Sequence, residues 1–259
     1  MEARNLILPA IAVFALASCE TTIDLDTAKT RFNAMSEHVE DPTFELPTDF
    51  RATRTIHSDY QGVKTELSSE TIFYPSKQFV AATVDGIQNN QKATMSTYIY
   101  VQGNQLITAM DMGEQNRFYT VLAQDSDTEA LKKIYNEALS QSTLGDSLTG
   151  VIKENYSMME FFFEAADGGE SDEEITNIDV KVSSKNESHL KVVAKLEGTS
   201  DGDEMYQEAT IEIDNYLPVY EYSFAKVNGE DVSRSESKIT YGVGSFSYPD
   251  LTGWTEMKA

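Results

Sequence analysis

Apolar and polar residues alternate along most of the chain, and this period of two predicts β-strands. In residues 189–197 and 205–214, apolar side chains fill nearly every second position, and the side chains between them are mostly polar or charged. Such alternation is typical of a strand with one buried face and one solvated face. We therefore expect a sheet that is buried on one side only, with the predicted helices as its cover.

Turn signals at intervals of about ten residues divide the chain into many such strands, which indicates an antiparallel meander. The first group of predicted strands is 50–60, 63–74, 78–84, 92–101, 105–112 and 115–123. The second group is 175–183, 189–197, 205–215, 218–227 and 231–241, with a further strand predicted at 243–248. Asn228-Gly229, between the last two long runs, is the strongest hairpin signal in the chain.

Apolar residues at spacings of three and four predict three helices. They span 23–39, 125–140 and 144–166, and Ser126 or Asp127 is the expected N-cap of the second. The resulting order is one helix, six strands, two helices and then five or six strands. This order indicates the α+β class.

Composition excludes several functions. The chain has 259 residues, with 20 Lys and Arg against 43 Asp and Glu, and its net charge is −23. Such a charge argues against a nucleic-acid partner, which requires a basic surface. The single Cys cannot close an internal disulfide or form a zinc site, and the three His are far apart in sequence. We expect no cofactor and no metal.

The first twenty residues predict export and lipidation. Leu6–Ala17 is an apolar run shorter than the ~20 residues that span a bilayer, and is of signal-peptide length. Leu16, Ala17, Ser18 and Cys19 then resemble a bacterial lipobox. The resemblance implies cleavage after Ser18 and a lipid on the sulfur of Cys19, which would hold the protein on a membrane outside the cytoplasm. The alternatives are an ordinary secreted protein with a free Cys and a cytosolic protein with a buried start.

The same pattern divides the chain into three parts. Residues 1–18 would be the signal peptide, residues 19–26 a lipidated tether, and residues 27–259 a single domain. With so acidic a body, we expect the domain to stand off an anionic membrane surface and to be monomeric.

The order of elements resembles the LolA-like carrier fold, which is also seen in LppX/LprG-type lipoproteins. Local similarities lie in Tyr98-Ile-Tyr-Val-Gln-Gly-Asn104, Tyr216-Leu-Pro-Val-Tyr220, Lys238–Tyr248 and Tyr248-Pro249-Asp250. The resemblance implies a strongly curved antiparallel half-barrel of about 11 strands wrapped around two or three helices. It also implies that lipid or acylated cargo binds between the sheet and the helices.

Methionine and aromatic residues supply the candidate ligand-binding surface, because such side chains adapt to irregular apolar ligands. The candidate lining residues are Tyr98, Tyr100, Met158, Met159, Phe162, Phe163, Tyr220 and Tyr222. The alternative is that these side chains simply fill a well-packed core.

Two patterns that resemble catalytic or metal-binding motifs fit them poorly. Gly198-Thr-Ser-Asp-Gly202 has the spacing of a hydrolase nucleophile elbow, but a strand and not a helix follows it, which favours a hairpin loop. Asp125-Ser-Asp127-Thr-Glu129 begins like a calcium loop. Ala130 stands where that loop needs glycine, so a helix cap is the better interpretation.

The sequence therefore predicts a non-enzymatic, envelope-anchored lipoprotein that binds or carries a lipid-like ligand. The alternative is a structural or interaction lipoprotein with a filled core, whose acidic surface contacts an envelope protein or a wall polymer. An envelope hydrolase is a third hypothesis, and no residue pattern favours it.

Overall fold

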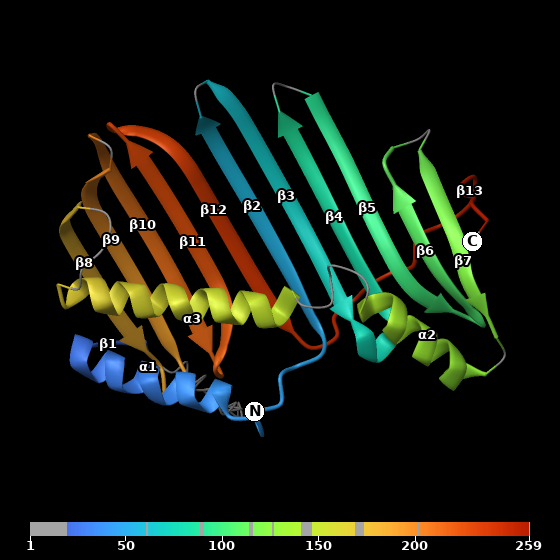
Figure 1. The fold of residues 1–259 in the computed structure, drawn as a ribbon, viewed down its shortest axis with the longest axis horizontal. Helices are drawn as coiled ribbons and strands as arrows, with labels where there is room; N and C mark the ends of the chain where they lie inside the picture. The colour runs from blue at the N-terminus through green and yellow to red at the C-terminus, as the bar shows by residue number, and fades with distance from the viewer. Residues whose placement is uncertain are drawn as a thin grey trace, which may run out of the picture.

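A single large, curved, open sheet dominates the described part of the protein (Figure 1). The computed structural model describes residues 20–60, 62–88, 91–113, 116–125, 127–140, 147–168, 174–200 and 202–258. The predicted signal peptide and lipobox, residues 1–19, lie outside these ranges. Within them the sheet has 13 strands in the order β1-β8-β9-β10-β11-β12-β2-β3-β4-β5-β6-β7-β13.

The first strands and the first helix are β1 (Thr21–Ile23), α1 (Leu25–Glu40), β2 (Phe50–Tyr60), β3 (Val63–Tyr74), β4 (Phe79–Gln88), β5 (Gln91–Gln102), β6 (Gln105–Asp111) and β7 (Arg117–Gln124). They are followed by α2 (Thr128–Ser140), α3 (Ser147–Ala166), β8 (Glu174–Ser184), β9 (Leu190–Ser200), β10 (Asp203–Asp214), β11 (Leu217–Val227), β12 (Glu230–Tyr241) and β13 (Thr255–Glu256). A short 3₁₀ helix, Pro75–Lys77, joins β3 to β4.

The α+β class and the long antiparallel meander are confirmed, with 13 strands in place of about 11. The added strands are β1 and β13, which are very short and lie at the two edges of the sheet. The predicted hairpin at Asn228-Gly229 is also confirmed, with φ values of 50° and 82° that suit a tight turn.

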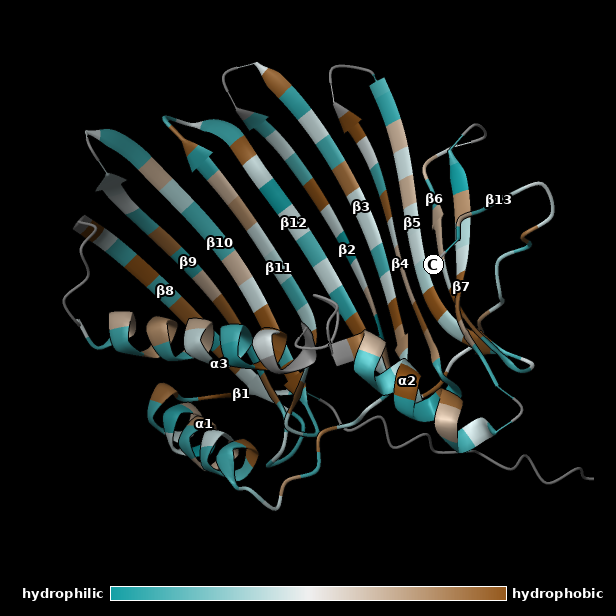
Figure 2. Ribbon diagram, turned by 45° about the vertical axis from the view of Figure 1, so that its right-hand side comes forward, coloured by the Kyte–Doolittle hydropathy of each residue, from teal (hydrophilic) through white to brown (hydrophobic). Residues whose placement is uncertain are grey.

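All three helices lie on the same side of the sheet, which we call the helix face; the other side is the opposite face (Figure 1). The helices cross only one end of the strands, and no other described helix or strand covers the rest of the helix face (Figures 1 and 2). The sheet is thus covered in part, and not wrapped around the helices along its whole length.

In the α1/α3 half of the sheet, β8–β12, the alternation has the predicted effect. Val192 and Ile211 point to the helix face and are fully buried, and the helix residues Phe32 and Met159 pack in the same cluster. The opposite face of these strands is polar, because the intervening residues are mostly charged or hydroxyl-bearing.

The first described residues of the chain already form a strand in the α1/α3 half of the sheet. Thr21–Ile23 pairs with Val182–Ser184 of β8 as an edge strand. Asp24 then caps α1 by accepting a hydrogen bond from the backbone N–H of Thr27 at 2.8 Å. Of the segment expected to be a tether, Thr21–Ile23 therefore forms a strand of the sheet, and α1 begins at Leu25.

In the α2 half of the sheet, β3–β7, the expectation of one solvated face is wrong. On β4, Val80 faces α2 and is 0% exposed, while Phe79 on the other side is 1% exposed. On β5, Ile99 and Tyr100 are likewise buried on opposite faces. The signal was present in the sequence, because both strands carry consecutive apolar residues where a half-buried strand would alternate.

The second cover is the C-terminal segment, residues 242–258, which crosses the opposite face behind the α2 half (Figure 1). Phe246 stacks on Phe79 with ring centroids 4.4 Å apart. Gly244 passes so close to the sheet that a Cβ there would lie 2.9 Å from Oη of Tyr74. The strand predicted at 243–248 is therefore wrong, because its aromatic residues dock on a sheet face and do not pair with a sheet edge.

Candidate functional site

Four of the eight predicted lining residues lie on α3 and are part of the packed cluster of the α1/α3 half. Met159, Phe162 and Phe163 are 0, 4 and 4% exposed, and Met158 packs against the same cluster. Phe161 points away and is 40% exposed, because three consecutive residues cannot share one side of a helix. An apolar ligand could reach the space beneath this part of α3 only by displacing the helix.

The other four lie on the opposite face. Tyr98 and Tyr100 of β5 are covered by the C-terminal segment. Tyr220 and Tyr222 of β11 are partly exposed, and the cations Lys238 and Arg234 of β12 lie 5.9 and 5.5 Å from the ring centroids. The structure therefore does not bring the eight residues together around one cavity.

A groove of about 550 Å³ lies beside these rings, among residues of β2, β3, β11 and β12. Tyr222 and Phe224 form its apolar part, and His57, Asp59 and Arg234 are among its polar residues. Because charged side chains rim the groove and lie over the rings, this surface suits a polar partner better than an acyl chain.

The uncovered part of the helix face carries an apolar surface that the sequence did not reveal. Met95, Met110 and Met112 are 45, 37 and 45% exposed. Met95 pairs with Val84 of β4, Met110 pairs with Phe118 of β7, and Thr97, two residues after Met95, pairs with Met110, so these side chains lie on one face; Met112 follows Met110 by two residues, just after β6. We call Met95, Met110, Met112, Val84 and Phe118 the methionine patch.

The methionine patch continues the surface on which α2 packs, farther along the strands that this helix crosses. Val80 and Ile99, which α2 covers, point to the same face of their strands as Val84 and Met95, which are not part of the cluster under α2. Exposed clusters of flexible, polarisable methionines are typical of surfaces that bind varied apolar partners.

An apolar groove also separates α1 from α3. Its volume is about 310 Å³, near the lower end for small-molecule sites. Phe32, Ile152 and Tyr156 contribute apolar surface, and Glu40 and Glu160 lie at the groove.

One arginine and one carboxylate lie on the part of the helix face between α3 and the methionine patch. Arg54 of β2 is exposed, and Glu221 of β11 is partly buried. Burial raises the pKa of Glu221, the positive charge of Arg54 opposes this shift, and the negative charge of Glu154 on α3 adds to it.

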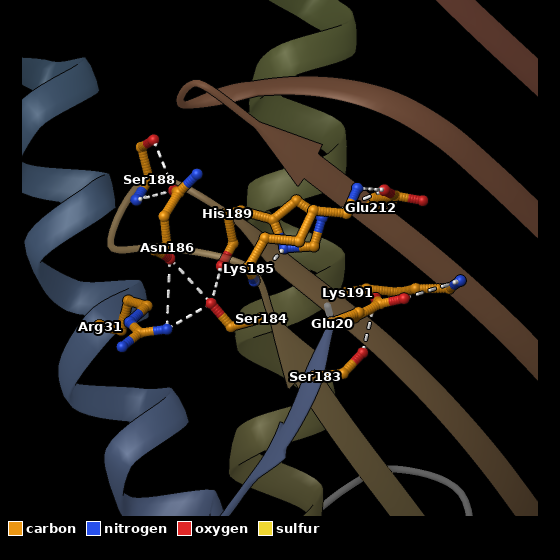
Figure 3. Close-up of polar contacts among 10 residues, drawn as sticks. All are labelled: Glu20, Arg31, Ser183, Ser184, Lys185, Asn186, Ser188, His189, Lys191 and Glu212. Carbon is orange, nitrogen blue, oxygen red and sulfur yellow. Dashed lines mark hydrogen bonds and ion pairs between the residues drawn. The ribbon is translucent and has the colours of Figure 1, made fainter. Parts of the chain in front are cut away.

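A buried polar network lies at the turn between β8 and β9, next to the first described residues (Figure 3). His189 is 0% exposed; its Nδ1 accepts a hydrogen bond from the backbone N–H of Lys185, and its Nε2 lies 3.1 Å from Oε1 of Glu212. The ammonium group of Lys185 lies 3.0 Å from the same oxygen. Arg31 of α1 bonds to the carbonyl of Asn186 and so ties the helix to this turn.

The network determines the charge of Glu212. Burial alone would raise the pKa of this carboxyl group, but hydrogen bonds from His189 and Lys185 outweigh burial and hold the pKa below its usual value. His189, Lys185 and Glu212 contact one another, which indicates a structural role in holding the β8–β9 turn, while Nε of Arg31 is buried with no hydrogen-bond partner among the described residues.

The motifs that resembled catalytic or calcium sites lie in ordinary local structure. Ser200 ends β9 and pairs with Asp203 of β10, so it lies in a β-hairpin. The side chain of Asp127 accepts the backbone N–H of Glu129 at the start of α2, as expected for a helix cap. Within the described ranges, no group of three or more His, Cys, Asp or Glu side chains could hold a metal ion.

Comparison with known proteins identifies no family for this chain. No protein-family model matches the chain, and no curated protein matches its sequence. Among solved structures, the chain is similar to a beta-barrel-like protein of a domain of unknown function, DUF1849, from Brucella abortus, with 8% sequence identity and a TM-score of 0.19. That match covers 77% of this chain and 100% of the other. Of the described helices, none is long and apolar enough to cross a bilayer.

Proposed function

We propose that this protein is an extracytoplasmic lipoprotein, anchored through Cys19, which binds a lipid-like ligand on the uncovered helix face without catalysing a reaction. The observation that carries the binding proposal is the methionine patch, where three methionines are each more than a third exposed, farther along the sheet than the part that α2 covers. In water such a surface is unfavourable, and covering it with an alkyl chain would remove apolar area from solvent.

The ligand site in this proposal differs from the cavity that the LolA-like resemblance implies. Met159, Phe162 and Phe163 fill the space beneath α3, so the ligand would lie on the sheet beside the helices and not under them. We retain the resemblance as a proposal for the fold family, supported by the curved meander and by three helices on one face.

Ligand binding is tested by titrating the purified protein with a fluorescent long-chain fatty acid. We expect the double variant Met95→Glu/Met110→Glu to bind at least about tenfold more weakly, because two charges replace apolar contact surface. The matched control is Ile87→Glu, since Ile87 is 37% exposed, as is Met110, but lies on the opposite face of β4. An equal loss of affinity in the double variant and in Ile87→Glu, or no binding by the wild type, would contradict the proposal.

Anchoring is tested separately by metabolic labelling with a radioactive fatty acid in bacteria. The wild type should be labelled and sediment with membranes, while Cys19→Ala should be unlabelled and soluble. Because β1 begins at Thr21, only Glu20 would separate the lipidated residue from the sheet edge. Cys19 itself lies outside β1, so we expect Cys19→Ala to lose the label without a change in unfolding temperature.

The filled core favours the second candidate, an interaction lipoprotein that carries no ligand. In that case the methionine patch would be a protein-binding surface, and the wild type would not bind the fatty acid. A wild type that binds no amphiphile but retains one envelope protein through Met95 and Met110 would support this alternative.

A further inference from the structure

Arg54 differs from the other basic residues of the sheet in its position. Among the described strands, it is the only Lys or Arg that the register places on the helix face. The cations on the opposite face mostly have acidic partners, such as Arg51 with Glu70 at 3.4 Å and Lys238 with Glu236 at 2.8 Å.

The guanidinium of Arg54 has no comparably close acidic partner among the described residues, and its charge acts on Glu221 without forming an ion pair. Its cross-strand neighbours are Ser237 on β12 and Ser69 on β3, and it forms no ion pair or hydrogen bond with another described side chain. A guanidinium offers five donors in a planar fork that suits carboxylate and phosphate groups. The short serine side chains leave room beside it and add hydroxyl donors.

The strand register connects Arg54 directly to the methionine patch. One lateral row on the helix face crosses six adjacent strands, from β11 to β5. Its members are Glu221, Ser237, Arg54, Ser69, Val84 and Met95. The row is therefore charged and polar at one end and apolar at the other.

The dimensions of this row fit an extended amphiphile. Neighbouring strands are about 4.8 Å apart, so three steps from Arg54 to Met95 span roughly 14 Å. An alkyl chain that crosses Val84 and reaches Met95 would place its headgroup at Arg54. The opposite orientation would direct the tail toward Glu221, where there is a carboxyl group and no apolar patch.

We infer that the ligand is an amphiphile with a single anionic headgroup, which Arg54 binds while the alkyl chain lies across Val84 and Met95. This inference rests on the proposed ligand binding and specifies its chemistry. In a protein with a net charge of −23, an arginine that forms no ion pair with a described side chain and lies in one row with an apolar surface is the feature that distinguishes an anionic amphiphile from a neutral one.

The test compares a fluorescent long-chain fatty acid with its methyl ester, at neutral pH, on the full chain. We expect the wild type to prefer the acid by about tenfold, the usual scale of one charge-assisted contact. Arg54→Gln should bind the ester as the wild type does and lose the preference for the acid. Arg54→Lys should keep part of that preference.

The matched control is Arg234→Gln, which removes an exposed arginine from the opposite face of the adjacent strand β12. It should change neither the affinity for the acid nor the affinity for the ester. A wild type that binds the ester as tightly as the acid, or an Arg54→Gln protein that keeps the preference, would overturn the inference while leaving lipid binding intact. Failure of the wild type to bind either compound would overturn the proposed function as well. Circular dichroism and the unfolding temperature show whether each variant is folded.

Discussion

The two halves of the sheet are stabilised in different ways. In the α1/α3 half, the helices cover one face and water meets the other, so polar and apolar residues alternate. In the α2 half, α2 covers one face and the C-terminal segment covers the other, so consecutive residues such as Phe79 and Val80 are both buried. The comparison teaches that runs of apolar residues within a strand are evidence for a second cover.

Buried tyrosines show the same contrast. In the α1/α3 half, the hydroxyl of Tyr156 donates to the carbonyl of Tyr216 at 3.0 Å, and that of Tyr241 donates to Pro218 at 2.7 Å. In the α2 half, the hydroxyls of Tyr100 and Tyr135 are buried with no hydrogen-bond partner among the described residues. The contrast is confined to these tyrosine hydroxyls, because Nε of Arg31 on α1 and Oδ1 of Asn155 on α3 are also buried with no hydrogen-bond partner among the described residues.

Deleting residues 244–258 should give the largest effect, because it removes the second cover of the α2 half. We expect a loss of at least about 3 kcal/mol of unfolding free energy, the usual cost of removing one large aromatic contact from a core. Amide hydrogen exchange should accelerate in β4–β6 more than in β9 and β10. Unchanged protection of β4–β6 would show that the segment is not a cover.

Glu212→Gln should weaken the α1/α3 half by about 2 kcal/mol, because Lys185 loses its charged partner in a partly buried site. The control Glu208→Gln lies on the same face of β10 and breaks a more exposed pair with Lys195, so it should cost under about 1 kcal/mol. Urea unfolding measures both.

The effect of Glu212 should depend on pH. The pKa of Glu212 is lower in the folded protein than its ordinary value of 4.5. The contribution of the ionised carboxylate to the free energy of unfolding is therefore complete above pH 4.5 and is lost as the pH falls through the folded pKa. The difference between wild type and Glu212→Gln should therefore shrink in acid. A difference that grows in acid would contradict the assignment.

Two Tyr→Phe substitutions should have small and opposite effects. Tyr156→Phe loses a hydrogen bond and should cost about 1 kcal/mol, while Tyr100→Phe removes an unpaired buried hydroxyl and should be neutral or slightly stabilising. Thermal unfolding at neutral pH distinguishes them. Equal destabilisation by both would contradict the contrast between the halves.

Alkaline pH sharpens this comparison. Burial raises the pKa of Tyr100 from 10.0 to about 12, with smaller contributions from Tyr248 and Tyr98. The folded state therefore binds the phenol proton of Tyr100 more tightly than the unfolded state does. The resulting contribution to the free energy of unfolding is complete below pH 10.0 and is lost as the pH rises toward about 12. Tyr100→Phe should reduce the decline in stability over that range.

Much of the local structure could be predicted from the sequence. The boundaries of β2 and β3, the turn at Asn228-Gly229 and the existence of the three helices follow from period, turn residues and caps. The candidate site could not be predicted in the same way. Aromatic and methionine content selected Met159 and Tyr100, which are buried core residues, and overlooked Met95, which is exposed.

The sequence by itself determined which face of a strand each residue occupies, because the period of two is a local property of the backbone. Only the tertiary structure decided which residues become lateral neighbours. Arg54 and Met95 are far apart in the chain, and the pairing of β12 with β2 and the meander from β2 to β5 bring Glu221, Arg54 and Met95 into one row. The extent of α2 and the path of the C-terminal segment likewise decided which apolar side chains are covered, because burial depends on segments distant in sequence.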